Sequence, residues 1–461
     1  MSTSALPPRI GTGFQRYLHA NYRGFYALKH TFQDRFTRAG FLVIAGIVAS
    51  GALGIDTNLT VTYQAFSFLS VLLLTAIATS RISLPRVAVE RRLPRYGTVG
   101  SPLRYTVRIV NQRPWLQAGV TFSERLADPR PSLHEFCTIT EPGEEKRNWL
   151  DRRYAYYRWT WLIGLNQQAI PGEHAIPAIP PGGEAEFPAE LLPLRRGVLR
   201  LNSVTINCPD VFGLFRSFVR VPASAKVLIL PRRYPLPAIA LPGAVKYQQG
   251  GVSLASSVGE SEEFIALRDY RPGDPRRHIH WKSWAKTGKP IVKEFQDEFF
   301  VRHALVLDTF SDEPFSELFE EAVSVAASFA CNLQTQDSLL DLMFVGPEAY
   351  CFTAGRGLGQ AEQMLEVLAA VRVTNDTGFE ALPRAVLDRV SGLSGCVLVL
   401  LSWDERRQAF VKRLRQLGIP LRVLVVVPKG AGKLEPGPMR DAPDQLTALP
   451  VDRVGATLAA L

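Results

Sequence analysis

The segment 268–288, RDYRPGDPRRHIHWKSWAKTG, is the most unusual stretch of this 461-residue chain, because it concentrates side chains that could bind metal ions or anions or take part in catalysis. Two histidines, two tryptophans and several arginines and lysines surround a Pro-Gly-Asp-Pro turn. Asp274 followed by Pro275 is typical of a helix start, and Gly288 is typical of a helix end. These signals predict a helix of about three turns between the two ends.

The two histidines of this segment could be considered as metal ligands. On a helix, His278 and His280 lie two residues apart and point about 200° away from each other, so they cannot bind one metal ion together. On a strand they would share one face and could do so. The helix caps argue against a strand, and a His-x-His metal site is therefore disfavoured.

Binding of phosphate groups by the basic side chains is the next chemical hypothesis for the segment. Residues 268–293 contain eight basic and two acidic side chains, but residues 259–298 contain eight of each. An acid–base–acid arrangement can pair internally or with an adjacent domain, whereas a polyanion site needs an unbalanced positive field. We therefore favour a structural and docking role.

The stretch LDTFSDE is a second candidate, because it follows an apolar strand at the position where α/β sheets collect function. It resembles the Asp-x-Ser-x-Ser loop of von Willebrand factor A domains, whose oxygen ligands suit Mg²⁺. Asp308 matches, whereas Phe310 and Asp312 replace the two hydroxyls; Thr377 and Asp404 could complete the ligand set. The favoured alternative is a metal-free sheet edge at which Asp308 holds loop amides.

Motifs for nucleotide hydrolysis and serine catalysis are missing from the chain. There is no G-x-x-x-x-G-K-[ST] phosphate loop and no G-x-S-x-G elbow, and GRGLGQ (355–360) lacks the spacing of a dinucleotide loop. The sequence therefore does not predict an enzyme, and it implies no cofactor beyond a candidate Mg²⁺ ion at the Asp308 loop.

The net charge of +10 raises the question of nucleic-acid binding, but its distribution argues against it. Residues 1–95 contain eleven basic and three acidic side chains, whereas the rest of the chain contains 42 and 40. A nucleic-acid binder needs its positive field on the folded domain that contacts phosphates. Here the excess surrounds two apolar runs, which a membrane explains better.

The two apolar runs predict a membrane hairpin at residues 39–80, with spans at about 39–57 and 61–80. The apolar runs at the centre of these spans, 39–55 and 65–80, contain no charged residue, and each has about the minimum length for a spanning helix. The alternative is a pair of buried core helices. It is disfavoured because no polar residues mark a solvent-exposed face.

The flanks of the hairpin predict its topology. The connecting loop has no lysine or arginine, whereas both outer flanks are rich in arginine, so the positive-inside rule places both termini in the cytoplasm. Gly46, Gly51 and Gly54 would let the helices approach closely. Residues 1–38 form a basic, aromatic lead-in typical of an interfacial helix. We expect a multi-pass protein of the cytoplasmic (inner) membrane.

The rest of the chain predicts two folded domains joined by the segment 236–298. Residues 81–235 show short alternating strands and turn signals, which indicate a β-sandwich-like domain. Within it, the aromatic run 149–164 is interpreted as a strand pair with inward-facing rings; an exposed strand that docks a partner or lipid is the alternative. Residues 299–461 alternate apolar strands with amphipathic helices, which predicts a doubly wound, mostly parallel sheet.

Two stretches of the chain resemble the domain-of-unknown-function family 58. Residues 259–298 carry its Gly-Glu-x-x-Glu-Phe start, its Arg-x-Tyr-x-Pro-Gly-Asp turn, its Trp-Lys helix and its Lys-Glu-Phe strand. The signature residues are Glu260, Glu263, Phe264, Arg268, Tyr270, Pro272, Gly273, Asp274, Arg276, Arg277, His280, Trp281, Lys282, Thr287, Gly288, Glu294 and Phe295. A second signature, CPDVFGLFRS, supplies Asp210, Phe212, Gly213, Leu214 and Phe215, with Val211 in place of the family's proline.

The resemblance has implications for architecture and partners. It implies a bacterial or archaeal protein with a membrane hairpin, a β-sandwich-like region and a von Willebrand factor A-like domain. It also implies a MoxR-type AAA+ ATPase as a partner, and a transglutaminase-like membrane protein as a further one. We therefore expect a membrane-anchored cytoplasmic adaptor that binds proteins and not nucleic acid. A metal-dependent receptor or an enzyme using the Asp308 loop is the alternative.

Overall fold

The structure, a computed structural model, consists of two compact units, Met1–Pro231 and Arg232–Leu461, which are considered separately. It describes residues 12–53, 60–82, 84–237, 264–272, 274, 276–295, 301–311, 316–332, 338–354, 358–374, 378–432 and 434–461. Domain boundaries finer than this division stay predictions.

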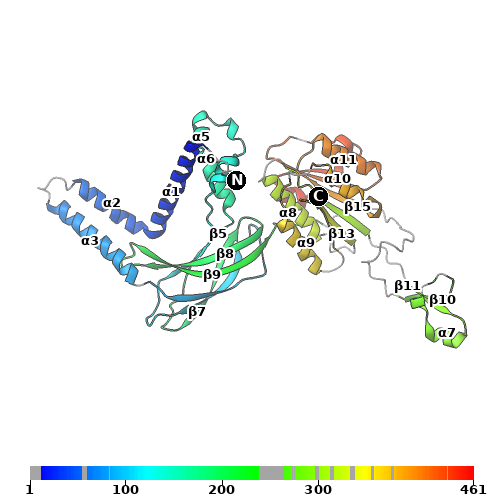
Figure 1. The fold of residues 1–461 in the computed structure, drawn as a ribbon, viewed down its shortest axis with the longest axis horizontal. Coiled ribbons are helices and arrows are strands. Elements are labelled where there is room, and N and C mark those ends of the chain that lie inside the picture. Colours follow the sequence, from blue (N-terminus) through cyan, green and yellow to red (C-terminus); the bar gives the residue numbers. More distant parts are fainter. Residues whose placement is uncertain are drawn as a thin grey trace, which may run out of the picture. The chain divides into compact units, whose positions relative to one another are not determined.

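Three helices begin the first unit: α1 (Gly13–Arg35), α2 (Arg38–Leu53) and α3 (Thr60–Ile82) (Figure 1). Among the described residues, one segment, Val61–Arg81, is long and apolar enough to cross a membrane, and only 6% of its apolar window is buried. This exposure argues against a core helix. The 16 residues of α2 extend about 24 Å, less than the roughly 30 Å hydrocarbon layer. Residues 54–57 of the first predicted span lie outside the described residues.

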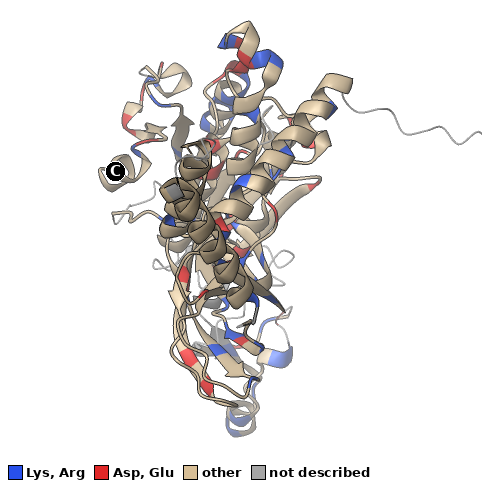
Figure 2. Ribbon diagram, turned by 90° about the vertical axis from the view of Figure 1, so that its left-hand side faces the viewer, with Lys and Arg blue, Asp and Glu red and all other residues tan. Residues whose placement is uncertain are grey.

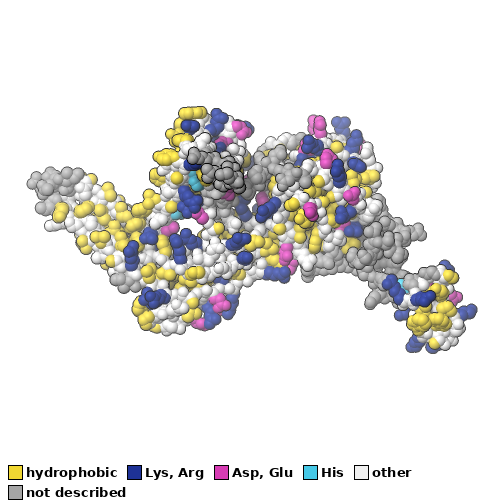
Figure 3. Space-filling view, viewed as in Figure 1, with side chains coloured by type: hydrophobic (Ala, Val, Ile, Leu, Met, Phe, Trp, Pro, Cys, Tyr) yellow, Lys and Arg dark blue, Asp and Glu magenta, His cyan; other side chains and the backbone are white. Residues whose placement is uncertain are grey.

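The helices α2 and α3 pack against each other as a hairpin. A Cβ at Gly46 would meet the Leu69 side chain at 3.0 Å, and one at Gly51 would meet the Phe66 ring at 3.4 Å. Gly46 and Gly51 therefore lie at the contact between the two helices, as predicted for both positions; Gly54 lies outside the described residues. Apolar side chains cover the pair (Figure 3), and charged positions along it are sparse (Figure 2).

A β-rich region follows the helices and confirms the prediction at that level. One sheet has the order β1-β3-β7-β5 and the other β2-β9-β8-β4-β6. Alternate residues of both sheets, such as Val107 and Ile206, point into one shared apolar core. The strands are β1 (Val87–Arg92), β2 (Tyr96–Thr98), β3 (Leu103–Asn111), β4 (Thr121–Arg125), β5 (Ala169–Pro171), β6 (Glu173–Ala175), β7 (Glu184–Pro193), β8 (Gly197–Pro209) and β9 (Arg216–Leu230).

The aromatic run 149–164, predicted as a strand pair, is helical, and that prediction is wrong. It forms α5 (Trp149–Tyr154) and α6 (Tyr156–Asn166), next to α4 (Leu133–Thr138) and η1 (Glu144–Lys146). Asn148 caps α5 by accepting a hydrogen bond from the Asp151 N–H at 2.7 Å. Trp159 and Leu162, three residues apart, are buried together with Phe136. Helical spacing and a cap outweighed the β preference of aromatic residues.

The second unit contains a six-stranded sheet of order β14-β13-β12-β15-β16-β17. All neighbouring strands are parallel except β13 and β14. The chain leaves β12 toward β13 on one side and continues from β15 on the other, so the order reverses between β12 and β15. The strands are β12 (Val301–Leu307), β13 (Ser338–Val345), β14 (Ala349–Ala354), β15 (Gly395–Leu400), β16 (Leu421–Val427) and β17 (Leu446–Pro450).

Helices cover both faces of this sheet (Figure 1). On one face Leu382 and Phe410 share a core with Val306 and Leu398. On the other, α8 contacts β12, β15 and β16. The elements are α8 (Glu317–Asn332), α9 (Leu358–Ala370), α10 (Ala381–Leu387), η4 (Val390–Gly392), α11 (Glu405–Gln416), η5 (Gly437–Met439), η6 (Pro443–Gln445) and α12 (Val454–Ala459).

The first signature forms a small hairpin of its own. The strands β10 (Phe264–Asp269) and β11 (Ile291–Phe295) pair antiparallel and enclose η2 (Arg276–His278) and α7 (Trp281–Thr287). The predicted single helix is therefore wrong in its length. It is interrupted because Ile279 bridges to Val292 and the His280 N–H donates to the Ile291 carbonyl at 2.8 Å. Gly288 ends α7 at a φ of 68°, as predicted.

Candidate functional site

Asp308 lies directly after β12, where the strand order of the sheet reverses. This is the position at which open α/β sheets place their ligands. Its carboxylate is fully buried and accepts hydrogen bonds from the N–H groups of Phe310 at 3.0 Å and Leu401 at 3.1 Å. The predicted role of Asp308 in holding loop amides matches this geometry.

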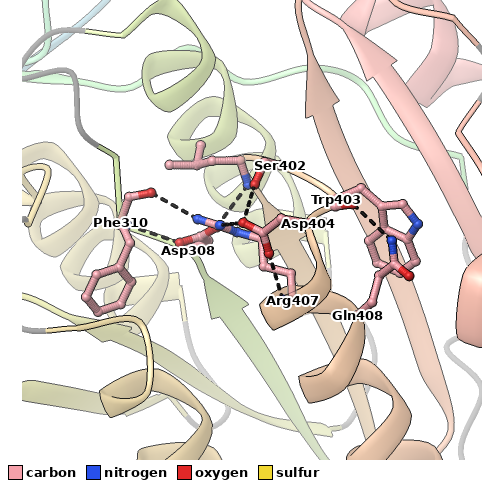
Figure 4. Close-up of polar contacts among 8 residues, drawn as sticks. Asp308, Phe310, Ser402, Trp403, Asp404, Arg407 and Gln408 are labelled. Carbon is pink, nitrogen blue, oxygen red and sulfur yellow. Dashed lines mark hydrogen bonds and ion pairs between the residues drawn. The ribbon is translucent and has the colours of Figure 1, made fainter.

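Arg407 of α11 provides a positive charge at this carboxylate (Figure 4). Its Nε donates to Asp308 at 2.6 Å, and its Nη2 donates to the Phe310 carbonyl at 3.0 Å. Its Nη1 pairs with Asp404. The guanidinium also stacks on the Phe379 ring, 4.8 Å from the centroid. One buried arginine therefore connects the ends of β12 and β15.

Asp404 has two roles in this arrangement. It caps α11, because its carboxylate accepts a hydrogen bond from the Arg407 N–H at 2.9 Å. The same carboxylate accepts from the Ser402 hydroxyl at 3.1 Å and pairs with the Arg407 guanidinium. Nearby, the Trp403 indole donates to the Glu435 carbonyl at 2.7 Å, and Gln408 donates to the Trp403 carbonyl at 3.0 Å. The loop after β15 is thus fixed from both sides.

The electrostatics of the three charged groups depend on each other. Burial raises the pKa of Asp308, while Arg407 and the N–H groups of Leu401 and Phe310 act against that rise. Burial disfavours the charge of Arg407, but Asp308 and Asp404 together raise the pKa of the guanidinium. The pKa of Asp404 is lowered because the Arg407 hydrogen bonds and charge outweigh its partial burial. The three groups form an internal ionic network in which the charged atoms are hydrogen-bonded to each other or to backbone groups.

The described residues here do not fit a Mg²⁺ ion. Both Asp308 oxygens accept N–H groups, and the Arg407 guanidinium already neutralises the carboxylate. Hard cations prefer oxygen ligands without a competing positive charge. Within the described ranges, no cluster of three histidine, cysteine or acidic residues could hold a metal. Asp312 and Thr377, two of the predicted ligands, lie outside the described residues.

Sequence reasoning missed Arg407, although a signal was present. Asp404 follows the apolar strand β15, and an arginine stands three residues later, in the first turn of a helix. That spacing turns the arginine back toward the strand ends. Thr309 and Thr374 were missed as well: the Thr374 N–H donates to the Thr309 carbonyl at 2.9 Å, which closes the same loop.

An ion pair organises the turn of the signature hairpin. Arg268 donates two hydrogen bonds to the Asp274 carboxylate at 2.7 and 2.8 Å, and the Arg271 N–H donates to it at 2.8 Å. Arg268 and the Arg271 N–H therefore lower the pKa of Asp274 to about 2. The Tyr270 N–H donates to the Pro290 carbonyl at 2.9 Å. Asp274 therefore closes the turn before η2, and its predicted role as a helix cap stays a prediction.

The short helix of the hairpin presents an aromatic surface. The Trp281 side chain is 63% exposed and stacks on Trp284, with ring centroids 5.2 Å apart and planes 19° from parallel. Arg276, Arg277, Lys282 and Thr287 are also exposed, whereas His280 is half-buried and contacts the Ser283 hydroxyl at 2.6 Å. Glu260, Glu263, Gly273 and Pro275, and the side chains of Phe264, Glu294 and Phe295, lie outside the described residues.

The second signature is a buried-carboxylate loop between β8 and β9. The Asp210 carboxylate accepts hydrogen bonds from the N–H groups of Phe212, Leu214 and Phe215 at 2.9, 2.6 and 2.7 Å. Gly213 has a φ of 68°, a conformation that favours glycine. The predicted residues are thereby brought together, and their chemistry is structural: one carboxylate satisfies the amides of a tight turn.

Together these features define a class: a mixed α/β protein with an apolar, membrane-length helix, a β-rich region and a largely parallel sheet that ends in a buried Asp–Arg network. Residues 266–417 match the family described as "Protein of unknown function DUF58". This match confirms, over that stretch, the resemblance to DUF58 that was predicted from the first signature.

One curated relative and two solved structures are similar to parts of the chain. The "Uncharacterized protein YeaD" of Bacillus subtilis (strain 168) is 28% identical over 184 residues, which is 39% of this chain and 44% of that protein. The CARDB domain of PF1109 from Pyrococcus furiosus has a TM-score of 0.16 and 10% identity, over 32% of this chain and 95% of that one. Red sea bream transglutaminase has a TM-score of 0.17 and 14% identity, over 32% of this chain and 15% of that one. Structural likeness this low supports no argument.

Proposed function

We propose that the protein is a membrane-anchored cytoplasmic scaffold whose signature hairpin, residues 264–295, docks a protein partner. The observation that supports this most is the exposed Trp281, which stacks on the half-buried Trp284 among basic side chains, on a turn fixed by the Arg268–Asp274 pair. Exposed tryptophan and arginine on a preorganised surface are the features of protein-binding hot spots. Within the described residues, no group of three histidine, cysteine or acidic side chains could hold a metal ion.

For the partner, we propose a MoxR-type AAA+ ATPase, with a transglutaminase-like membrane protein as a further member of the assembly. The proposal rests on the resemblance to DUF58 proteins. The scaffold would present a client for assembly or maturation. The charge distribution still disfavours nucleic acid, because +8 of the net charge lies in residues 1–95.

For the anchor, we propose that α2 and α3 both enter the inner membrane as a multi-pass hairpin, with both termini in the cytoplasm. The support is their close packing at Gly46 and Gly51 and the arginines at the outer ends, Arg38 and Arg81. A membrane helix that is shorter than the hydrocarbon layer is accommodated by local thinning of the bilayer or by flanking residues that reach the interface.

For the α/β domain, we propose a von Willebrand factor A-like domain in which Arg407 takes the place of the metal ion. A fixed internal cation supports a constitutive scaffold and argues against a metal-dependent receptor or an enzyme at the Asp308 loop, the competing function. Equilibrium dialysis of the full-length protein against Mg²⁺ and Mn²⁺ separates the two. Stoichiometric binding that is lost in Asp308→Asn would favour the receptor.

Co-purification from detergent-solubilised membranes tests the docking proposal. Trp281→Ser, and separately the pair Arg276→Glu and Arg277→Glu, should abolish recovery of the ATPase with the full-length protein. Leu417→Ser is the matched control, because Leu417 is an exposed apolar residue of the α/β domain. If the hairpin variants stay folded by circular dichroism and recover the ATPase as wild type does, the hairpin is not the docking site.

A further inference from the structure

We propose that the Asp210 loop, residues 210–215, is a second membrane contact, whose tip residues Val211 and Phe212 insert at the boundary between lipid headgroups and acyl chains. The inference rests on the proposed membrane anchor and extends it to the β-rich region. Three independent observations carry it: a rigid loop with an exposed apolar tip, its attachment to the ends of the membrane helices, and the charge around it.

The loop holds its apolar tip out by a dedicated set of hydrogen bonds. Asp210 is buried, and its carboxylate accepts three loop N–H groups, while the Asp210 N–H donates to the Phe215 carbonyl at 2.9 Å. Leu214 and Phe215 point inward, but Val211 is 79% and Phe212 51% exposed. A turn this well satisfied leaves two adjacent apolar side chains in contact with solvent. Such a rigid, outward tip is typical of a residue pair with an external apolar partner.

The partner is indicated by where the loop is attached. The Thr37 N–H donates to the Leu214 carbonyl at 3.1 Å, and its hydroxyl donates to the Gly213 carbonyl at 2.6 Å. Phe36 bridges to Phe215, with ring centroids 5.2 Å apart. These contacts lie at the residues where α1 ends and α2 begins.

The loop region is also attached to α3. The hydroxyl of Ser217, two residues past the loop, donates to the Ser80 hydroxyl at 2.7 Å in a buried contact. Ser80 is the penultimate residue of the membrane-length segment Val61–Arg81. Anchored at the start of α2 and the end of α3, the loop lies at the level where the apolar span gives way to the aqueous phase. That level is the headgroup boundary.

The charge at this level suits anionic lipid. Arg38 begins α2, Arg81 closes the membrane-length segment, and Arg35 lies over the rings of Phe215 and Phe218 at about 6 Å. The acidic residue of the loop, Asp210, is buried and fully used by amides. Basic residues beside an inserted apolar tip are the arrangement of interfacial membrane contacts. A protein partner on the same tip is the competing occupant, and the experiment distinguishes it.

Site-specific photocrosslinking of the full-length protein in vesicles of phosphatidylcholine and phosphatidylglycerol tests the proposal. The probe p-benzoylphenylalanine replaces Phe212, an exposed position at which the longer side chain fits. The matched control is Val198, which is also 51% exposed but lies near the other end of β8, roughly 35 Å away along the strand. The positive reference is Phe68, exposed on α3. Lipid adducts are measured by mass spectrometry.

We expect lipid adducts at positions 212 and 68, each several times more abundant than at position 198. Adducts at 68 without an excess at 212 over 198 would overturn the loop contact and leave the anchor in place. Without adducts at 68, the anchor itself, and with it the proposed function, would fail. The same probe in native membranes covers the other occupant: a protein adduct at 212 that replaces the lipid adduct would overturn the proposal.

Discussion

At the scale of single residues, the account depends on buried charges that satisfy each other. Asp308 and Arg407 are almost fully buried, and each is bonded to backbone as well as to the other. Such pairs contribute little net stability when complete, but each partner depends strongly on the other. A site of this kind orders the ends of β12 and β15.

Replacing Arg407 with methionine tests this dependence. The variant should lower the free energy of unfolding by about 3–5 kcal/mol, because Asp308 keeps its burial and loses its charge partner. Denaturant titration of the full-length protein in detergent measures the change. The exposed neighbour Arg406→Met is the control and should change it by less than about 0.5 kcal/mol. Equal effects of the two variants would contradict the internal ion pair.

His303 of β12 makes stability depend on pH. Burial lowers the pKa of His303 from its usual 6.5, because the charged imidazolium loses solvation. Below pH 6.5 the unfolded chain therefore binds a proton that the folded protein takes up only at lower pH, and stability falls as the pH falls. Unfolding midpoints from pH 7.5 down to about 5 should decline less in His303→Leu than in wild type. In the exposed control His134→Ala they should follow wild type; a decline unchanged in His303→Leu would contradict the prediction.

At the scale of elements, much of the structure was readable from local patterns. The period-two run at β3, the apolar strands of the parallel sheet and the αL glycine at Gly288 follow from side-chain alternation and backbone sterics. The interrupted signature helix did not, because its break comes from the His280 N–H, which donates to the carbonyl of Ile291 in β11, eleven positions further along the chain. The Arg407 contact was also missed, since it joins residues 99 positions apart.

The junction of α2 with the Asp210 loop makes an element-scale prediction. A Cβ at Gly40 would overlap the Leu214 carbonyl, so Gly40→Ala should separate α2 from the loop and lower the thermal midpoint in detergent. Gly24→Ala in α1 is the matched control. Its Cβ would meet nothing within 4 Å, and alanine should stabilise the helix by up to about 1 kcal/mol. A Gly40→Ala midpoint at or above that of wild type would contradict the close backbone contact.

At the scale of the whole molecule, net charge and apolar character distinguish the N-terminal helices from the rest of the chain. The basic excess surrounds the apolar helices, and the two units bring a β-rich region and a parallel sheet with balanced charge. Charge counting predicted this division because it needs no tertiary information. The role of the second signature as a support for the membrane helices was not predictable, because the contacts of Leu214 with Thr37 span 177 positions.

The anchor prediction is tested by removing residues 1–80. The shortened protein should leave the membrane fraction after an alkaline carbonate wash, whereas the full-length protein should stay in it, because the apolar span is lost. Immunoblotting of washed membranes and supernatants measures the distribution. A shortened protein that stays in the washed membranes as completely as the full chain would contradict a role for the helices as the anchor.

The central claim, a scaffold that docks an AAA+ ATPase through its signature hairpin, is tested most directly by crosslinking in native membranes. The probe p-benzoylphenylalanine at Trp281 reports the hairpin, and the same probe at Leu417 reports another exposed apolar position, in the α/β domain. Mass spectrometry identifies the adducts. We predict ATPase subunits crosslinked at position 281 and none at 417. No ATPase adduct at 281, or the same adducts at both positions, would contradict the claim.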